Sequence, residues 1–340
     1  MTASVERMQA VWVRQHGGPE SLELTELPVP VPAPGQVRVK AHAIGAGRPD
    51  VLIRNGSYKW MPPLPAIPGN EMAGVVDALG EGATCWSLGD RVLLSSRELP
   101  QRGGGYAEYQ CAPADGLYAL PASIGFDDAV SLPNFQLALA MMASARSDRA
   151  TRAVLITGAA GGVATALAQV ARVAGAKVIG IASSEAKRRF ALDCGFDDML
   201  DTRTANLPEQ VRGLTAGCGV DLAFDHIGGH LVVECLRALA PLGTLVSYNI
   251  AAGAPATDLF MEMRAHLGRS LALRVFSMHS FDADAAQRRR LMQDAIDAMA
   301  AGSVRAPRAT VLPLAQAREA HRIMDAGQTI GKIVLHPASV

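Results

Sequence analysis

A group of small residues near the middle of the chain has the types and spacing that suit phosphate binding. Gly158-Ala-Ala-Gly-Gly-Val163 follows the apolar run 153–156 and precedes an alanine-rich stretch over 163–174. A strand, a glycine turn and a helix in this order direct backbone N–H groups and a helix N-terminus at a pyrophosphate. The alternative is a plain strand-to-helix turn. The predicted dinucleotide-binding residues of this turn are Gly158, Ala160, Gly161, Gly162 and Val163.

The residues after the next strand indicate which dinucleotide is bound. An Asp or Glu about 20 residues after the glycines usually holds a free ribose 2′-hydroxyl, but Ser183 and Ser184 occupy that region. Lys187 and Arg188 follow, and basic groups beside hydroxyls suit a 2′-phosphate. Glu185 weakens this argument, and the two basic residues could instead form a solvated helix face. The pattern predicts NADPH rather than NADH.

The composition excludes several classes of partner. Lys plus Arg and Asp plus Glu each number 32, without a basic block, so nucleic acid and anionic membranes are poor candidates. No apolar run is long enough to span a bilayer, and residues 1–8 lack an apolar signal core, so we expect a cytoplasmic protein. The five cysteines are scattered without a Cys-x-x-Cys pair, which favours neither a disulfide framework nor a clustered zinc site.

Elements of two kinds must position these residues. The first third of the chain alternates polar and apolar residues, as at 9–13 and 36–43, with closely spaced turns typical of a small β barrel. From about Phe126 strands alternate with helices, which predicts a doubly wound parallel α/β sheet of about six strands. The expected strands are 153–156, 177–181, 199–201, 220–224, 243–247 and 271–275; the expected helices are 127–143, 163–174, 185–192, 209–214 and 230–239. A further strand is expected at 105–109, and a final helix at 315–326 and strand at 332–335 should pack back onto the first domain.

Short motifs follow one another in an order that resembles a known superfamily. They are Gly35-Gln-Val-Arg-Val39, Asp50-Val-Leu-Ile-Arg-Asn-Gly-Ser-Tyr58, Pro68-Gly-Asn-Glu-Met-Ala-Gly74, Gly89-Asp-Arg-Val92, Gly104-Gly-Tyr-Ala-Glu-Tyr109, the glycine turn, Asp225-His-Ile-Gly-Gly229 and Gly331-Lys-Ile-Val-Leu335. The chain resembles the medium-chain dehydrogenase/reductase superfamily, in its zinc-independent quinone oxidoreductase (zeta-crystallin-like) branch.

The resemblance implies a fold and a domain layout. It implies a Rossmann doubly wound parallel sheet plus a GroES-like β-barrel-type catalytic domain, with the active site between them. The expected boundaries are 1–122 for the first part of the catalytic domain, 123–280 for the NADPH-binding domain, and 281–340 for the returning segment. It further implies NADPH-dependent reduction of quinones or activated enones by a homodimer.

Zinc ligands of the metal-dependent relatives are replaced in this chain. Gly47 stands where their first catalytic cysteine would fall, and Asn70 replaces the ligating histidine. The segment 94–105 has no cysteine for a structural zinc lobe. Since zinc needs thiolate or imidazole ligands, we expect no metal.

The substrate pocket departs from the pattern of the branch. Gly47 and Leu52 replace a usual Asn and a frequent Tyr, and Thr202 replaces a tyrosine beside the adenine ribose. The resemblance places Gly47, Arg48, Leu52 and Asn134 in the pocket. Arg48 could hold an anionic substrate or a cofactor phosphate, or be a surface arginine.

Five further residues complete the set of candidates. Tyr58 is a candidate proton donor or a packing tyrosine. Asn249 and Phe276 match positions that line the nicotinamide in relatives, and Lys332 lies near the cofactor in the resemblance or simply begins a strand. His226 is interpreted as structural, and no Ser/His/Asp or Cys/His set indicates nucleophilic catalysis.

We therefore expect a zinc-free oxidoreductase that transfers hydride from NADPH to a quinone, an enone or a related conjugated carbonyl. The alternatives are an enoyl-thioester reductase, in which Arg48 contacts a phosphate of the thioester carrier, and a non-catalytic NADPH-binding sensor or structural protein. The apolar edge strand at 271–275 favours a homodimer.

Overall fold

The computed structural model describes residues 6–145, 148–203 and 206–337. The chain divides into two compact units, one formed by Met1–Pro133 with Arg308–Val340 and the other by Asn134–Pro307. These divisions fall later than the expected boundaries at 122/123 and 280/281, and residues 281–307 lie in the central unit. In the part described, no helix is long and apolar enough to cross a membrane.

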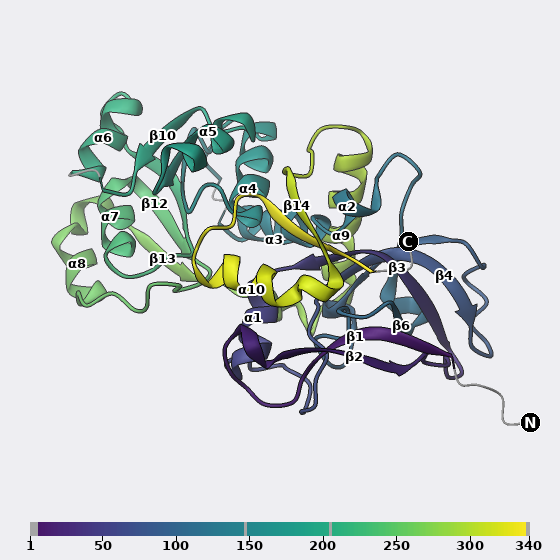
Figure 1. Ribbon diagram of the computed structural model, residues 1–340. Helices are drawn as coiled ribbons and strands as arrows, with labels where there is room; N and C mark the ends of the chain where they lie inside the picture. Colours follow the sequence, from purple (N-terminus) through teal and green to yellow (C-terminus); the bar gives the residue numbers. More distant parts are fainter. Residues whose placement is uncertain (1–5, 146–147, 204–205, 338–340) are drawn as a thin grey trace, which may run out of the picture. The chain divides into compact units, whose positions relative to one another are not determined.

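The first unit is a β structure formed by both ends of the chain (Figure 1). One sheet has the strand order β14-β15-β3-β4-β5-β7, β6 pairs with β3, and β1 pairs with β2. Its strands are β1 (Arg7–Val13), β2 (Leu22–Pro28), β3 (Gln36–Ala46), β4 (Glu71–Leu79), β5 (Arg91–Ser95), β6 (Tyr109–Pro113), β7 (Leu117–Ala119), β14 (Ala309–Pro313) and β15 (Lys332–His336). Its helices are α1 (Arg48–Asn55), α2 (Phe126–Ala129) and α10 (Ala317–Asp325).

The returning end of the chain completes the core of this unit. β15 lies antiparallel to β3, with Ile333 opposite Ala46, and parallel to β14. Ile333 and Leu335 are buried in the same apolar cluster as Val39 and Met72 of the first third of the chain. This pairing confirms that the strand at 332–335 packs back onto the first domain.

The second unit is a parallel sheet with helices on its faces (Figure 1). Its strands are β8 (Ala153–Thr157), β9 (Lys177–Ala182), β10 (Asp198–Asp201), β11 (Val220–Asp225), β12 (Leu239–Ser247) and β13 (Ala272–Val275). Their order is β10-β9-β8-β11-β12-β13, which confirms the predicted doubly wound fold. The order reverses between β8 and β11, so this is the switch point where such sheets bind ligands. The helices are α3 (Leu132–Ala145, which begins just before the division), α4 (Gly162–Val173), α5 (Glu185–Asp193), α6 (Leu207–Leu214), α7 (His230–Ala238), α8 (Leu259–Ala265) and α9 (Ala285–Ala300).

Two predicted elements differ from the structure. The helix expected over 127–143 is divided into α2 and α3, because Pro133 lacks an N–H group and is tolerated only in the first turn of a helix. The strand expected over 105–109 is also displaced. β6 begins only at Tyr109, while the preceding residues contact β1 through a hydrogen bond of 2.9 Å from Val11 N to Tyr106 O.

Candidate functional site

The glycine turn joins β8 to α4. Gly158 has φ +59°, a left-handed conformation that favours glycine, and its carbonyl accepts a hydrogen bond from Gly161 N at 2.9 Å. Gly161 is the N-cap residue, so the amides of Gly162 and Val163 lie in the first turn of α4. Such amides have no partner within a helix and can bind an anion. Ala160 and Ala164 are buried, so the small residues let the helix pack closely on the sheet.

A buried carboxylate fixes the adjacent strand end. Asp225 ends β11, and its carboxylate accepts hydrogen bonds from Thr157 Oγ1 at 2.6 Å and from Gly228 N at 2.8 Å. Thr157 is the last residue of β8, so these bonds tie together the two strands at the switch point. Burial and Asp225 raise the pKa of Tyr248, whose hydroxyl lies 3.3 Å from Nδ1 of His226. His226, interpreted from the sequence as structural, lies directly after β11 and beside Tyr248, which directly follows β12.

The two serines and two basic residues after β9 have different environments. Ser184 caps α5, its hydroxyl accepting a hydrogen bond from Lys187 N at 3.3 Å, and Ser183 precedes it. Arg188 forms ion pairs with Asp201 at 2.8 Å and with Glu185 at 3.1 Å. Its guanidinium is therefore already bound to two carboxylates.

Asp201 and Arg203 were missed as site residues by the sequence reasoning. Arg203 also pairs with Asp201, at 2.9 Å, and its hydrogen bonds lower the pKa of this carboxyl group. The available signal was the position of Asp201 at the end of the third strand. Since β10 is parallel to β9, the carboxyl ends of both strands lie at the same edge of the sheet.

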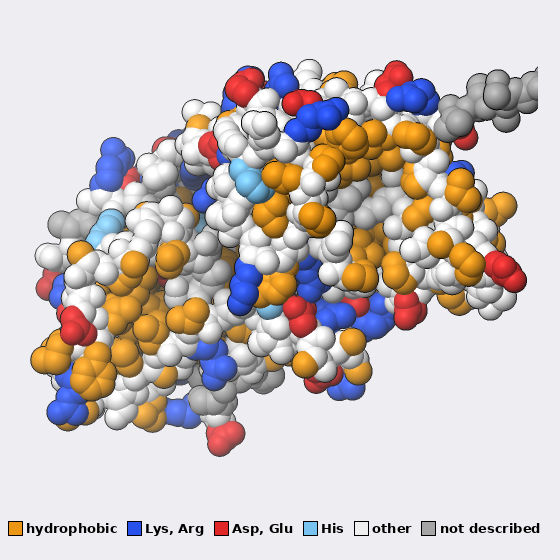
Figure 2. All heavy atoms as spheres, turned by 90° about the horizontal axis from the view of Figure 1, so that it is seen from below, with side chains coloured by type: hydrophobic (Ala, Val, Ile, Leu, Met, Phe, Trp, Pro, Cys, Tyr) orange, Lys and Arg blue, Asp and Glu red, His pale blue; other side chains and the backbone are white. Residues whose placement is uncertain are grey.

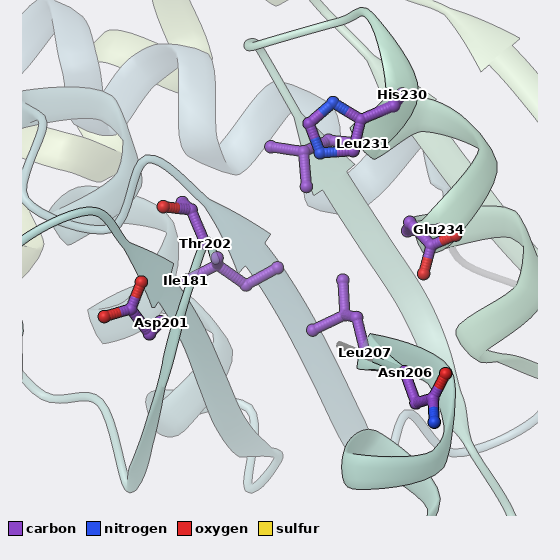
Figure 3. A pocket seen from close by; sticks show the side chains of 8 residues that line it. All are labelled: Ile181, Asp201, Thr202, Asn206, Leu207, His230, Leu231 and Glu234. Atoms are coloured by element: carbon purple, nitrogen blue, oxygen red, sulfur yellow. The ribbon is translucent and has the colours of Figure 1, made fainter. Parts of the chain in front are cut away.

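A pocket lies beside this edge (Figure 3). Its volume is about 260 Å³, smaller than the roughly 300–1,000 Å³ of pockets for whole drug-sized ligands. The lining residues come from the ends of β9 and β10 and from the beginnings of α6 and α7. They are Ile181, Asp201, Thr202, Asn206, Leu207, His230, Leu231 and Glu234.

The other predicted residues of the central unit lie on several elements. Asn249 follows β12 and bonds Ile250 N through its own side chain at 2.9 Å. Phe276 follows β13, is 7% exposed, and donates its N–H to Ser247 O. Asn134 is half-buried in α3. Asn249 and Phe276 therefore both lie beyond the carboxyl ends of strands of the central sheet.

In the first unit, Asp50 organises the segment around Gly47 and Asn70. Its carboxylate accepts hydrogen bonds from Gly47 N at 2.8 Å, Gly69 N at 3.0 Å and Asn70 Nδ2 at 2.6 Å. Burial raises the pKa of Asp50 to about 6, against the opposing effect of Asn70. The amide oxygen of Asn70 accepts a further bond from Ser96 Oγ, so both ends of its side chain are held.

A buried chain of hydrogen bonds leads away from Asp50. Arg54 can only donate, so Nδ1 of His321, 3.3 Å away, accepts and the ring carries its proton on Nε2. Nε2 lies 3.1 Å from the Tyr106 hydroxyl, which in turn bonds to Asp50. Burial and the charge of Arg54 lower the pKa of His321 to about 3, so this ring is neutral.

The remaining predicted residues of the first unit lie around this network. Lys332 is 4% exposed and its ammonium contacts the Glu71 carboxylate. Arg48 is exposed and Leu52 is half-buried, both in α1, and the Tyr58 ring packs on Trp60 with centroids 5.8 Å apart. Among the residues described, His, Cys, Asp and Glu side chains form no group of three or more that could hold a metal ion.

Comparisons with known proteins match both units. A model described as "Alcohol dehydrogenase GroES-like domain" matches residues 33–122, and one described as "Zinc-binding dehydrogenase" matches residues 194–335. Human quinone oxidoreductase is 33% identical over 249 residues, which are 72% of this chain and 74% of that protein. A 2-haloacrylate reductase of a Burkholderia species is 32% identical over 338 residues, 97% of this chain and 99% of that protein.

A solved structure extends the similarity to three dimensions. Escherichia coli quinone oxidoreductase, complexed with NADPH, aligns with a TM-score of 0.85 and 28% identity. The alignment covers 97% of this chain and 100% of the bacterial enzyme.

Proposed function

Because the chain belongs to the zinc-independent quinone oxidoreductase branch of the medium-chain dehydrogenase/reductase superfamily, we propose that it reduces a quinone, an enone or a related conjugated carbonyl with NADPH. The observation that carries this proposal is the glycine turn at the switch point of a doubly wound sheet, beside a pocket at the same edge. The solved relative with NADPH bound supports the choice of cofactor.

The residues of the central unit fit the parts of this dinucleotide. Gly158, Gly161 and the first-turn amides of Gly162 and Val163 would hold the diphosphate, with Ala160 packed beneath them. The pocket next to Thr202 would seat the adenine end, and Asn249 and Phe276 would lie beside the nicotinamide. When bound, the cofactor supplies hydride from its nicotinamide ring.

The residues around Asp201 would bind the 2′-phosphate. Ser183 and Ser184 offer hydroxyls, Lys187 lies in the first turn of α5, and Arg188 and Arg203 converge on one carboxylate. Two arginines held by one carboxylate are already oriented, so a phosphate needs only to take over some of their N–H groups.

A conjugated acceptor suits the groups of the first unit. Gly47 and Asn70 offer neither thiolate nor imidazole, whereas a quinone or enone accommodates the added charge in its own conjugated system. We place the substrate beside Gly47, Arg48 and Leu52 of this unit, with Tyr58 as a candidate proton donor.

A second candidate substrate class is a conjugated acid or thioester. Arg48 is exposed at the first position of α1, where its guanidinium could bind a carboxylate or a phosphate of the substrate. The similarity to a 2-haloacrylate reductase favours this class, and it includes the enoyl-thioester alternative.

The test is loss of NADPH absorbance in the presence of quinones, alkenals, 2-haloacrylates and enoyl thioesters. Turnover of quinones or alkenals supports the first class, and turnover of acids or thioesters that Arg48→Gln abolishes supports the second. Tight NADPH binding without turnover of any of these compounds would favour a non-catalytic NADPH-binding protein.

We also propose that the protein is a homodimer formed through β13. This strand is at the edge of its sheet, with Val275 85% exposed. Apolar side chains gather at the left of Figure 2, where Figure 1 places α8 and β13. Phe260 and Met261 of α8 and Leu267, which follows that helix, are exposed. Pairing of two copies of β13 would cover both the edge and these side chains.

We further propose a cytoplasmic location. The five cysteines are free, and the charges balance at 32 basic and 32 acidic residues. Free thiols suit a reducing compartment. Fractionation of cells with an antibody against the protein would test this location.

A further inference from the structure

Three neighbouring strands of the central sheet carry Gly158, His226 and Tyr248 at their carboxyl ends. Gly158 directly follows β8, His226 directly follows β11, and Tyr248 directly follows β12. His226 therefore stands at the switch point between β8 and β11, next to the turn assigned to the diphosphate.

The His226 ring packs directly on the glycine turn. A methyl group added to Gly158 would lie 2.1 Å from Cε1 of His226 and 2.8 Å from its Nε2. Glycine at this position thus serves two purposes, since it allows the positive φ and leaves room for the imidazole. The end of the ring between its two nitrogens faces Gly158 of the glycine turn.

The backbone and the ring of His226 are both held in place. Its N–H donates to Thr157 Oγ1 at 3.3 Å, and Asp225 immediately before it bonds Gly228 N at 2.8 Å. The Tyr248 hydroxyl lies 3.3 Å from Nδ1, and Tyr248 N donates to Asp225 O at 3.0 Å. A hydroxyl can donate to a neutral ring or accept from a protonated one, so Tyr248 supports both states of the histidine.

We propose that His226 is a cofactor-binding residue whose imidazole donates to the diphosphate at the glycine turn, with Tyr248 as its positioning residue. This inference rests on the proposed use of a nicotinamide dinucleotide. Histidine is the side chain whose charge ordinarily changes between about pH 5 and 8. Protonation places a positive charge beside the anion, while the second N–H donates to the Tyr248 hydroxyl, so cofactor affinity should rise as pH falls.

The choice of probe separates this effect from other titrations. Among the contacts described for this ring, Asp225 precedes it and Tyr248 bonds it, and burial keeps the Tyr248 hydroxyl protonated by raising its pKa. The 2′-phosphate of NADPH itself titrates near pH 6, as phosphate monoesters do. NADH and ADP-ribose keep the diphosphate but lack that group, so they are the appropriate ligands.

The experiment measures dissociation constants of NADH and ADP-ribose from pH 5.5 to 8.5 by calorimetry. For the natural chain we expect roughly tenfold tighter binding at the acidic end, the effect of one charge-assisted hydrogen bond. His226→Gln and His226→Asn should remove this dependence for both ligands. Tyr248→Phe should keep this dependence but move its midpoint to lower pH. The bond from the protonated ring to the hydroxyl is charge-assisted, so it is stronger than the bond lost from the neutral ring.

His266→Gln is the matched control, since this histidine pairs with Glu262 in α8 and should leave the profile unchanged. Thermal melting of each variant verifies that it is folded. An equal pH dependence in the natural chain and in both His226 variants would overturn the inference. Dependence for NADH but not for ADP-ribose would overturn the assignment to the diphosphate.

These outcomes are distinct from failure of the proposed function. If the protein reduces conjugated carbonyls with NADPH but binds NADH equally at all pH values, the proposed function stands and only the role of His226 is contradicted. If the protein binds none of NADPH, NADH and ADP-ribose, both the proposed function and the role of His226 are contradicted.

Discussion

At the scale of single residues, burial moves the pKa values of His321 and Asp50 in opposite directions. The pKa of His321 falls to about 3 and that of Asp50 rises to about 6. Between about pH 4 and 6 the unfolded chain holds one more proton on the histidine, and the folded chain holds one more on the aspartate. The two contributions to the pH dependence of stability should therefore offset each other in this range.

His321→Gln should remove one of these contributions. As pH falls from about 6.5 to 4, His321 destabilises the natural chain by about 1.4 kcal/mol per pH unit, because the unfolded state gains a proton that the folded state does not. The difference in free energy of unfolding between the natural chain and the variant should narrow by that amount per unit. Urea unfolding at several pH values measures it, with the exposed His16→Gln as control. A constant difference across this range would contradict the prediction.

The arginines around Asp201 should decide between the two nicotinamide cofactors. Replacing both Arg188 and Arg203 by Gln should weaken NADPH binding by roughly 10- to 100-fold, through loss of charge-assisted bonds to phosphate, and leave NADH binding unchanged. Asp201→Asn should strengthen NADPH binding, since it removes a carboxylate that competes for the same N–H groups. Titrations of both cofactors test this.

Arg189→Gln is the matched control for the arginine pair. Arg189 lies on the same helix and pairs with Glu185 at 2.8 Å, but not with Asp201 in the bonds described. Equal losses of NADPH and NADH affinity in the double variant would show that the arginines only support the fold.

Some of these candidate site residues could be predicted from the sequence and others could not. The glycines of the turn and Ser184 make their contacts within the turn or the next helical turn, so local spacing was sufficient to predict where they lie. The proposed roles of Asp201 and His226 depend on which strands are neighbours in the sheet. A local sequence pattern does not contain this information.

At the scale of elements, β13 is the part of the central sheet that a partner would cover. Val275→Lys places a charge on this edge strand, where a second copy would have to bury it, and should convert the dimer to a monomer. Light scattering measures the mass. Val31→Lys is the control, since Val31 is 84% exposed in the other unit. A monomeric natural chain, or a dimeric Val275→Lys variant, would exclude this interface.

Periodicity predicted the six strands of the central sheet better than it predicted the ends of helices. Each predicted strand was recognised as a short run bounded by turn residues, and these runs correspond to β8 to β13 in the structure. The division between α2 and α3 depends on Pro133, and the start of β6 depends on pairing with β3 across many residues. Only the first of these had a local signal.

At the scale of the whole molecule, the replacement of zinc ligands has a direct consequence. The amide of Asn70 is bound by Asp50 and Ser96 on both its ends, and Gly47 offers only its backbone. Prolonged dialysis against a chelator should leave NADPH-dependent turnover unchanged, and elemental analysis should find less than stoichiometric zinc. Stoichiometric zinc that survives the chelator, or activity that returns only with zinc, would contradict this prediction.

The placement of β15 between β14 and β3 has a consequence for biosynthesis. The central unit is one continuous segment, Asn134–Pro307, and can fold as soon as it leaves the ribosome. The β3 edge, made far earlier, stays uncovered until residues 332–336 emerge. Chains that end before residue 309 and are released from the ribosome should therefore hold a folded central unit together with an uncovered β3 edge, which is prone to aggregation.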